Sequence, residues 1–213
     1  AALYEGDYGY QLIGDVASLG FTVNGIVPDG FRVMTMNKKV ESLADMHGLK
    51  MRMPNLEIMV EIGNYLGFAV TPMSMTEVFS ALEQGVIDGQ ENPPSTIRSQ
   101  GWYEIQDYLL VSNHVFTSLF LCVNNDFYNS LDSELQNILD EVIDETCAQI
   151  WDTAQTQAQE DLDYMSSEGG IEVYEPSDSF RQEMVEATAP MYDNMYETAP
   201  EVEEVINAIQ AIQ

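Results

Sequence analysis

The sequence predicts an α/β fold in which short strands and helices alternate around a partly parallel sheet. Between residues 21 and 99, apolar runs of strand length alternate with segments of helical periodicity, and Gly or Pro stands at most boundaries. Residues 102–168 contain neither Gly nor Pro and include a helical pattern sustained for more than thirty residues. A helix of roughly 45 to 50 Å, at about 1.5 Å per residue, is longer than one small domain needs, so we expect it to span two.

The first half of the chain is expected to contain strands separated by short helices. An initial helix over residues 1–19 is indicated by Tyr4, Tyr8, Leu12 and Val16, which recur every four residues. Strands are then expected at 21–27, 31–36, 49–53, 68–71 and 86–88, and helices at 42–46, 55–66, 74–82 and from 93 onward.

Three local signals support these elements. Pro28-Asp-Gly30 is typical of a turn. Residues 31–36 alternate as a half-buried strand does, which places Arg32 and Met34 on one face. Ser74-Met-Thr-Glu77 has the form of a capping box at a helix start.

The second half is expected to be mostly helical. Residues 108–123 predict two strands or one long bent strand, and the long helix follows Leu131. A last strand at 171–174 precedes two acidic helices, at about 178–197 with a kink or break near Pro190 and at about 200–212.

Charge is the unusual feature of the composition. Thirty-six Asp and Glu against seven Lys and Arg give a formal net charge of −29, and residues 125–213 hold 22 acids and one base. Binding to nucleic acid or to an anionic membrane needs clustered Lys and Arg, so neither is expected as a partner. No apolar run approaches the roughly 18 residues of a membrane span, so no direct insertion is expected. A solubilising acidic surface and adaptation to high salt both remain open.

No catalytic or metal-binding constellation stands out. His47 is expected at the surface, and His114 either is a hydrogen-bonded structural residue or lines a cleft. Cys122 and Cys147 match no zinc or redox spacing and are expected to be buried free thiols. Neither a Ser-His-Asp nor a Cys-His triad is present, so we expect no enzyme activity, cofactor or metal.

Two short segments carry the most informative polar residues. Gly48-Leu-Lys-Met-Arg-Met-Pro54 and Gly85-Val-Ile-Asp-Gly-Gln-Glu-Asn-Pro-Pro94 each read as an apolar run that ends at a polar turn. If the two turns face one cleft, Arg52 with Glu91 and Asn92 could hold a small organic anion there, because a guanidinium matches a carboxylate in bidentate geometry. The competing interpretation is that Arg52 and Arg32 simply pair with acids nearby.

These segments resemble the substrate-binding proteins of TRAP (tripartite ATP-independent periplasmic) transporters. The resemblance rests on the two segments above, on Thr71-Pro-Met-Ser-Met-Thr-Glu-Val-Phe79, and on Trp102-Tyr-Glu-Ile-Gln-Asp-Tyr-Leu109 followed by Asn113-His114. It implies a two-lobed periplasmic-binding-protein-like fold whose long helix serves both lobes. It further implies that 1–29 and 118–156 are the remnant of a first lobe, that 30–117 and 157–213 form the second, and that the chain is truncated at its amino terminus.

The resemblance also implies site residues and partners. Arg52 would hold the ligand carboxylate, a second arginine falls on Arg32, and Asn92 with Glu91 beside it would orient the ligand. Asn55 and Met75 would line the ligand. Met75 departs from the family, whose members often have an aromatic residue there.

The implied function is a periplasmic or extracytoplasmic receptor that delivers a small organic acid to TRAP membrane subunits. Two alternatives remain open at this point. One is an enzyme of small organic-acid metabolism, for which His114 and Glu91 are the only candidates for proton transfer. The other is a ligand-sensing module of a signalling system.

Overall fold

The computed structural model describes residues 13–14, 16–200 and 202–210. The chain forms two compact units, the first of residues 1–30, 117–156 and 201–213 and the second of residues 31–116 and 157–200. Residues 201–213 group with the first unit, whereas the sequence analysis assigned them to the second lobe. The identification of the units with lobes stays a prediction. Most of the expected helix over 1–19 lies outside the described residues, of which 13–14 and 16–18 are helical.

The first unit contains a two-stranded sheet and helices. Its strands are β1 (Phe21–Phe31) and β7 (Phe116–Asn124), and its helices are α6 (Asn125–Ser130), the first two thirds of α7 (Ser133–Ser167) and α10 (Val202–Gln210). The turn expected at Pro28-Asp-Gly30 is wrong, because these residues continue β1. A two-stranded sheet has only edge strands, so a proline there need not remove a ladder hydrogen bond.

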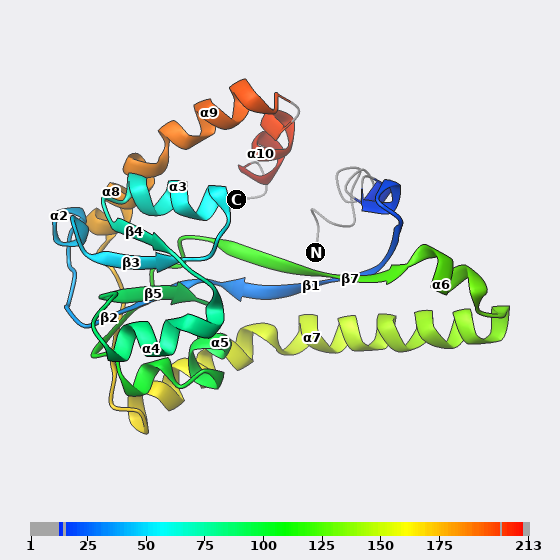
Figure 1. The fold of residues 1–213 in the computed structure, drawn as a ribbon, viewed down its shortest axis with the longest axis horizontal. Coiled ribbons are helices and arrows are strands. Elements are labelled where there is room, and N and C mark those ends of the chain that lie inside the picture. The colour runs from blue at the N-terminus through cyan, green and yellow to red at the C-terminus, as the bar shows by residue number, and fades with distance from the viewer. Residues whose placement is uncertain (1–12, 15, 201, 211–213) are drawn as a thin grey trace. The chain divides into compact units, whose positions relative to one another are not determined.

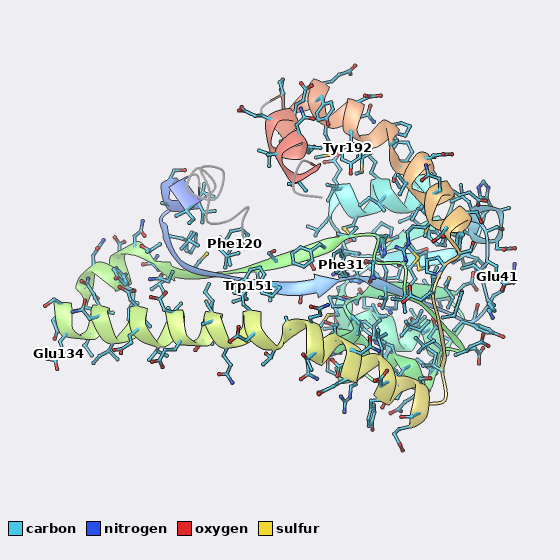
Figure 2. All side chains as sticks on the ribbon, turned by 180° about the vertical axis from the view of Figure 1, so that it is seen from behind. Phe31, Glu41, Phe120, Glu134, Trp151 and Tyr192 are labelled. Atoms are coloured by element: carbon cyan, nitrogen blue, oxygen red, sulfur yellow. The ribbon has the colours of Figure 1, made fainter. Side chains whose placement is uncertain are left out.

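Helix α7 packs on β1 inside this unit. Trp151 points from α7 toward β1 (Figure 2), and its indole N–H donates to the Ile26 carbonyl at 2.9 Å. A side chain at Gly25 would collide with the Sγ of Cys147, so the glycine permits this close approach. Cys147 is half-buried and Cys122 is exposed, so the expectation of two buried thiols is wrong for Cys122; both cysteines are free.

The second unit is built on a six-stranded mixed sheet. Its strand order is β4-β3-β5-β2-β6-β8. The bounds are β2 Val33–Met36, β3 Lys50–Met53, β4 Ala69–Pro72, β5 Gly89–Asn92, β6 Tyr108–Leu110 and β8 Glu172–Tyr174. Strand β3 is parallel to β4 and β5, β6 is parallel to β8, and β2 is antiparallel to both of its neighbours. Five carboxyl ends and the amino end of β2 therefore meet at one end of the sheet.

Helices cover both faces of this sheet. One face carries α2 (Leu43–Met46), α3 (Glu57–Tyr65), α8 (Asp178–Thr188) and α9 (Pro190–Thr198). The other carries α4 (Val78–Glu83), α5 (Pro94–Ser99) and the end of α7, with the one-turn helices η1 (Met75–Glu77) and η2 (Trp102–Glu104). Figure 1 shows α3 and α4 on opposite sides of the sheet. The first core is rich in methionine: Met34, Met36, Met46, Met51, Met53, Met59, Met184 and Met191.

Most expected helices are confirmed, including the 35-residue α7 and the break at Pro190. Two strand assignments need correction. The strand expected at 86–88 lies at 89–92, and β2 is wholly buried rather than half-buried, because helices cover both sheet faces. Of the two alternatives for residues 108–123, the structure has the two strands, β6 and β7, and they belong to different sheets.

Gly89 provides a test of this packing. A Cβ at Gly89 would collide with the backbone carbonyl oxygen of Thr35 on the neighbouring strand, and backbone cannot swing away as a side chain can. We expect Gly89→Ala to lower the free energy of unfolding by about 1–3 kcal/mol. Denaturant titration measures this effect.

Gly14→Ala is the matched control, because nothing lies within 4 Å of its added Cβ and it is helical. Its stability should be unchanged or higher by up to about 1 kcal/mol. Equal stability of the Gly89→Ala variant and the wild type would contradict the β2–β5 register described here.

Candidate functional site

The central strand β5 is polar yet completely buried. Gly89–Asn92 lies between β3 and β2, with three consecutive polar side chains. Buried polar groups need hydrogen-bond partners, and these residues have them. Gln90 Nε2 donates to Thr35 Oγ1 at 2.9 Å, and Asn92 Nδ2 donates to Gln90 Oε1 at 2.8 Å. A polar segment can therefore occupy the middle of the sheet, where the sequence analysis expected a turn.

Arg32 neutralises Glu91 inside the protein. Its Nε donates to Glu91 Oε2 at 2.5 Å and its Nη2 to Glu91 Oε1 at 2.9 Å, a bidentate fork. The same Nη2 contacts the Glu91 carbonyl at 2.9 Å and Asn92 Oδ1 at 3.1 Å. Glu91 has no exposed surface, so this pair is the compensation that a buried carboxylate requires.

His114 completes the surroundings of Glu91. Its Nε2 lies 3.4 Å from Glu91 Oε2, and its Nδ1 lies 2.8 Å from Ser112 Oγ. Burial by itself would raise the pKa of Glu91, but the nearby His114 ring and the hydrogen bonds and charge of Arg32 outweigh burial, so the pKa is lowered. Glu91 is therefore a structural anion and not a proton donor near neutral pH.

Arg52 differs from Arg32 because it has no acidic partner. It is 3% exposed, and its Nε and Nη2 donate to the Met73 carbonyl oxygen at 3.1 and 2.9 Å. Within the described part of the chain, no Asp or Glu forms an ion pair with it. Burial lowers the pKa of this guanidinium, with the charge of Glu91 acting in the opposite direction and that of Arg32 in the same direction.

The strand register places Arg52 and Glu91 on opposite faces of the sheet. Arg52 pairs with Gln90, and Glu91 is the next residue along β5. Asn92 is two residues after Gln90, on the Arg52 face, and it accepts a hydrogen bond from Arg32. Asn92 therefore links the two faces where β5 ends.

The remaining predicted residues lie at the same end of the sheet. Asn55 follows β3 and is exposed, and Met75 follows β4 and is 45% exposed. The structure brings Arg32, Glu91 and Asn92 into contact. Among the described residues, the hydrogen bonds of the Arg52 side chain go to the Met73 carbonyl and not to Asn92, Asn55 or Met75. The sequence analysis did not predict Gln90, Thr35 or the Met73 carbonyl oxygen as parts of the site. Gln90 could have been found from the unusual Gln-Glu-Asn run, but a backbone acceptor leaves no sequence signal.

Within the described ranges, no three His, Cys, Asp or Glu side chains form a group that could hold a metal ion. None of the helices in those ranges combines the length and apolarity that crossing a bilayer requires. His47 is exposed, as expected.

Ligands of open α/β sheets bind outside the carboxyl ends of the strands. A buried guanidinium at that end, with no acidic partner in the described ranges, points to a protein that binds a small anionic solute. Comparison with known proteins agrees with that class. Residues 1–199 match the family of bacterial extracellular solute-binding proteins, family 7, and the chain belongs to this family.

Individual relatives are similar over most of the chain. A C4-dicarboxylate-binding periplasmic protein from Rhodobacter capsulatus is 30% identical over 91% of this chain and 58% of its own length. A TRAP periplasmic solute-binding protein from Haemophilus influenzae with bound L-gulonate is 31% identical, with a TM-score of 0.92, over 99% of this chain and 69% of that one. A sugar-acid-binding protein from Advenella mimigardefordensis with bound galactonate is 27% identical, with a TM-score of 0.92, over 99% of this chain and 69% of that one.

These matches confirm the predicted family and fold class. They also show that the chain spans 55% and 58% of the length of two curated relatives. Both ligand-bound relatives are described as binding proteins rather than as enzymes.

Glu91 can be tested through the pH dependence of stability. Because the pKa of Glu91 is lowered on folding, its carboxylate stabilises the protein fully above the ordinary glutamate pKa of about 4.3. This contribution is lost as the pH falls through the lower folded-state pKa. We expect Glu91→Gln to destabilise by about 3–5 kcal/mol near pH 7, because Arg32 is left buried without a counterion, and by less in acid. Urea titrations over a pH series measure the difference.

Glu172→Gln is the control, because Glu172 forms an exposed ion pair with Lys39 in the same sheet. Its loss of stability should be much smaller than that of Glu91→Gln, because solvent screens an exposed ion pair. Similar decreases in the free energy of unfolding for the two variants would show that the buried Arg32–Glu91 pair contributes no more to stability than an exposed ion pair does.

Proposed function

We propose that this chain is part of an extracytoplasmic receptor that holds a small organic acid through an ion pair between Arg52 and the ligand carboxylate. The observation that carries the proposal is the buried guanidinium of Arg52, which lacks an acidic partner in the described part of the chain. A buried charge is costly unless it is paired. The family supports the same interpretation, because relatives were solved with gulonate and galactonate bound.

The geometry of Arg52 leaves donors for a ligand. A guanidinium has five N–H groups, and the Met73 carbonyl accepts from two of its nitrogens. Both Nη1 hydrogens and one Nη2 hydrogen remain, enough for a bidentate contact with a carboxylate. The Met73 carbonyl fixes the fork, so little rotamer freedom remains to be lost on binding.

The other residues have supporting roles in this proposal. Asn92 offers its amide beside the ligand, and the Arg32–Glu91 pair holds Asn92 in place through the 3.1 Å contact. Asn55 and Met75 line the ligand, and Met75 suits an aliphatic part better than an aromatic ring would. The loaded receptor delivers its ligand to TRAP membrane subunits from the periplasmic or outer side of the membrane.

Replacement of Arg52 tests the ion pair. In the full-length gene product, Arg52→Ala should weaken the binding of a sugar acid such as L-gulonate or galactonate by about 2–5 kcal/mol, because the ligand carboxylate loses its partner. Arg52→Lys should recover only part of this loss, since an ammonium cannot form the fork. Isothermal titration calorimetry with a panel of organic acids measures both effects.

Lys50→Ala is the matched control. It removes one positive charge from the opposite end of the same strand, where the side chain is exposed. We expect wild-type affinity within about threefold. An Arg52→Ala variant that binds as tightly as the Lys50→Ala variant would refute the proposed role of Arg52.

A further inference from the structure

Three polar side chains of the second unit are joined by hydrogen bonds from β2 to the end of β5. Thr35 on β2 and Gln90 on β5 are partners in the strand register, and both are completely buried. Gln90 Nε2 donates to Thr35 Oγ1 at 2.9 Å, and Gln90 Oε1 accepts from Asn92 Nδ2 at 2.8 Å. We call Thr35, Gln90 and Asn92 the hydrogen-bond relay.

Arg52 lies on the same face of the sheet as this relay. Gln90 has Arg52 as its register partner on β3 and Thr35 as its partner on β2, so the three side chains form one row across adjacent strands. Asn92 is two residues after Gln90 and shares that face. The guanidinium and the Asn92 amide therefore lie on one face, where β3 and β5 approach their carboxyl ends.

Arg32 fixes the direction of the hydrogen bonds in the relay. A guanidinium can only donate, so the atom of the Asn92 amide that lies 3.1 Å from Arg32 Nη2 has to be the oxygen. The Asn92 nitrogen then faces Gln90, which must present its own oxygen to it. The Gln90 nitrogen is left toward Thr35, whose hydroxyl oxygen accepts. Reversing either amide would bring two donors together, which is unfavourable inside a protein.

The relay leaves one hydrogen of the Asn92 amide for a ligand. Asn92 Nδ2 carries two hydrogens, and the bond to Gln90 uses one of them. Asn92 also keeps a small exposed surface, whereas Gln90 and Thr35 have none. A ligand can therefore touch Asn92, and any influence of Gln90 or Thr35 on binding has to act through a neighbouring side chain.

We infer that Gln90 is a positioning residue for ligand binding. Supported by Thr35, it holds the Asn92 amide so that the second Nδ2 hydrogen is presented on the Arg52 face of the sheet. The inference rests on the proposed function, because it assumes that a carboxylate on Arg52 brings a further acceptor oxygen of the ligand to Asn92. The ligand class that fits is a carboxylate with such an oxygen nearby, for example the hydroxyl of a sugar acid.

Fixing the amide in advance favours binding for a physical reason. The last torsion of an asparagine side chain is soft, and half a turn exchanges the donor for the acceptor. An amide that is already held at both of its ends loses little freedom when the ligand arrives. Without Gln90, the Asn92 nitrogen would lose the partner that sets its direction.

A double-mutant cycle on ligand affinity tests the inference. The full-length gene product is titrated calorimetrically with L-gulonate or galactonate, whichever binds more tightly. Gln90→Met should bind about five- to tenfold more weakly than the wild type, because methionine has similar length but neither amide atom. In the Asn92→Ala background, the same change should alter the affinity by less than about twofold, because the side chain through which Gln90 acts is gone.

Thr35 supplies a second arm that does not alter Gln90. Thr35→Val removes the acceptor of Gln90 Nε2 and should weaken binding by about threefold or more. Thr35→Ser keeps the hydroxyl and should bind within about twofold of the wild type. A role in packing alone predicts the opposite order, because Val fills the volume of Thr whereas Ser leaves a cavity.

Gln106→Met is the matched control for the loss of a buried glutamine. Gln106 is buried, and its Nε2 donates to the Ile105 carbonyl oxygen at 3.4 Å. It precedes β6 and so lies at the opposite end of the sheet. Its affinity should stay within about twofold of the wild type, even if its unfolding temperature falls. Thermal unfolding of each variant separates a loss of stability from a loss of affinity.

The outcomes distinguish this inference from the proposed function. Wild-type affinity in a folded Gln90→Met variant, or an equal loss from Gln90→Met with and without Asn92, would overturn the role of Gln90. If Arg52→Ala still weakens binding in that case, the proposed function stands. Affinity that does not depend on Arg52, or absence of binding by every organic acid in the panel, would overturn both. If Gln90→Met does not fold, the order of the two Thr35 variants decides.

Discussion

The second unit depends on one buried ion pair, that between Arg32 and Glu91. A carboxylate with no exposed surface in the central strand of a sheet would be strongly unfavourable without a partner. The fork from Arg32 supplies that partner from the neighbouring strand region, and it also satisfies the Glu91 carbonyl and the Asn92 amide oxygen. The pair therefore makes it possible for β5 to be polar and central at once.

The two arginines show how context decides the role of a residue. Arg32 and Arg52 are both buried and both lie at the strand ends of one sheet, but only Arg32 meets an acid among the described residues. Arg52 meets a carbonyl, which orients its fork without cancelling its charge. One end of this sheet therefore carries a neutral pair and a guanidinium that has no acidic partner in the described ranges.

The sequence predicted the helices and the family well, because helical periodicity, capping residues and glycine stops are local signals. It predicted the strands less well. The apolar Val86 and Ile87 predict a strand at 86–88, but the strand lies at 89–92. The polar side chains of β5 have their hydrogen-bond partners some 55 to 60 positions away, where no local pattern reveals them. The pairing of Arg32 with Glu91 and the support of Arg52 by the Met73 carbonyl are long-range in the same sense. Motif resemblance identified Arg52, Arg32 and Asn92 as site residues. It could not show which of the two arginines is neutralised by an acidic residue.

The acidity of the chain bears on how such a site works. A net charge of −29 repels an anionic ligand at long range, so the overall field cannot guide it to Arg52. Recognition must then come from contacts at short distance, where the guanidinium is shielded from salt by burial. Dissolved salt screens the long-range repulsion over about 8 to 10 Å while leaving the buried contact largely intact. The same imbalance therefore favours tolerance of salt, because screening weakens the repulsion between the acidic surface and an anion more than it weakens a contact with the buried guanidinium.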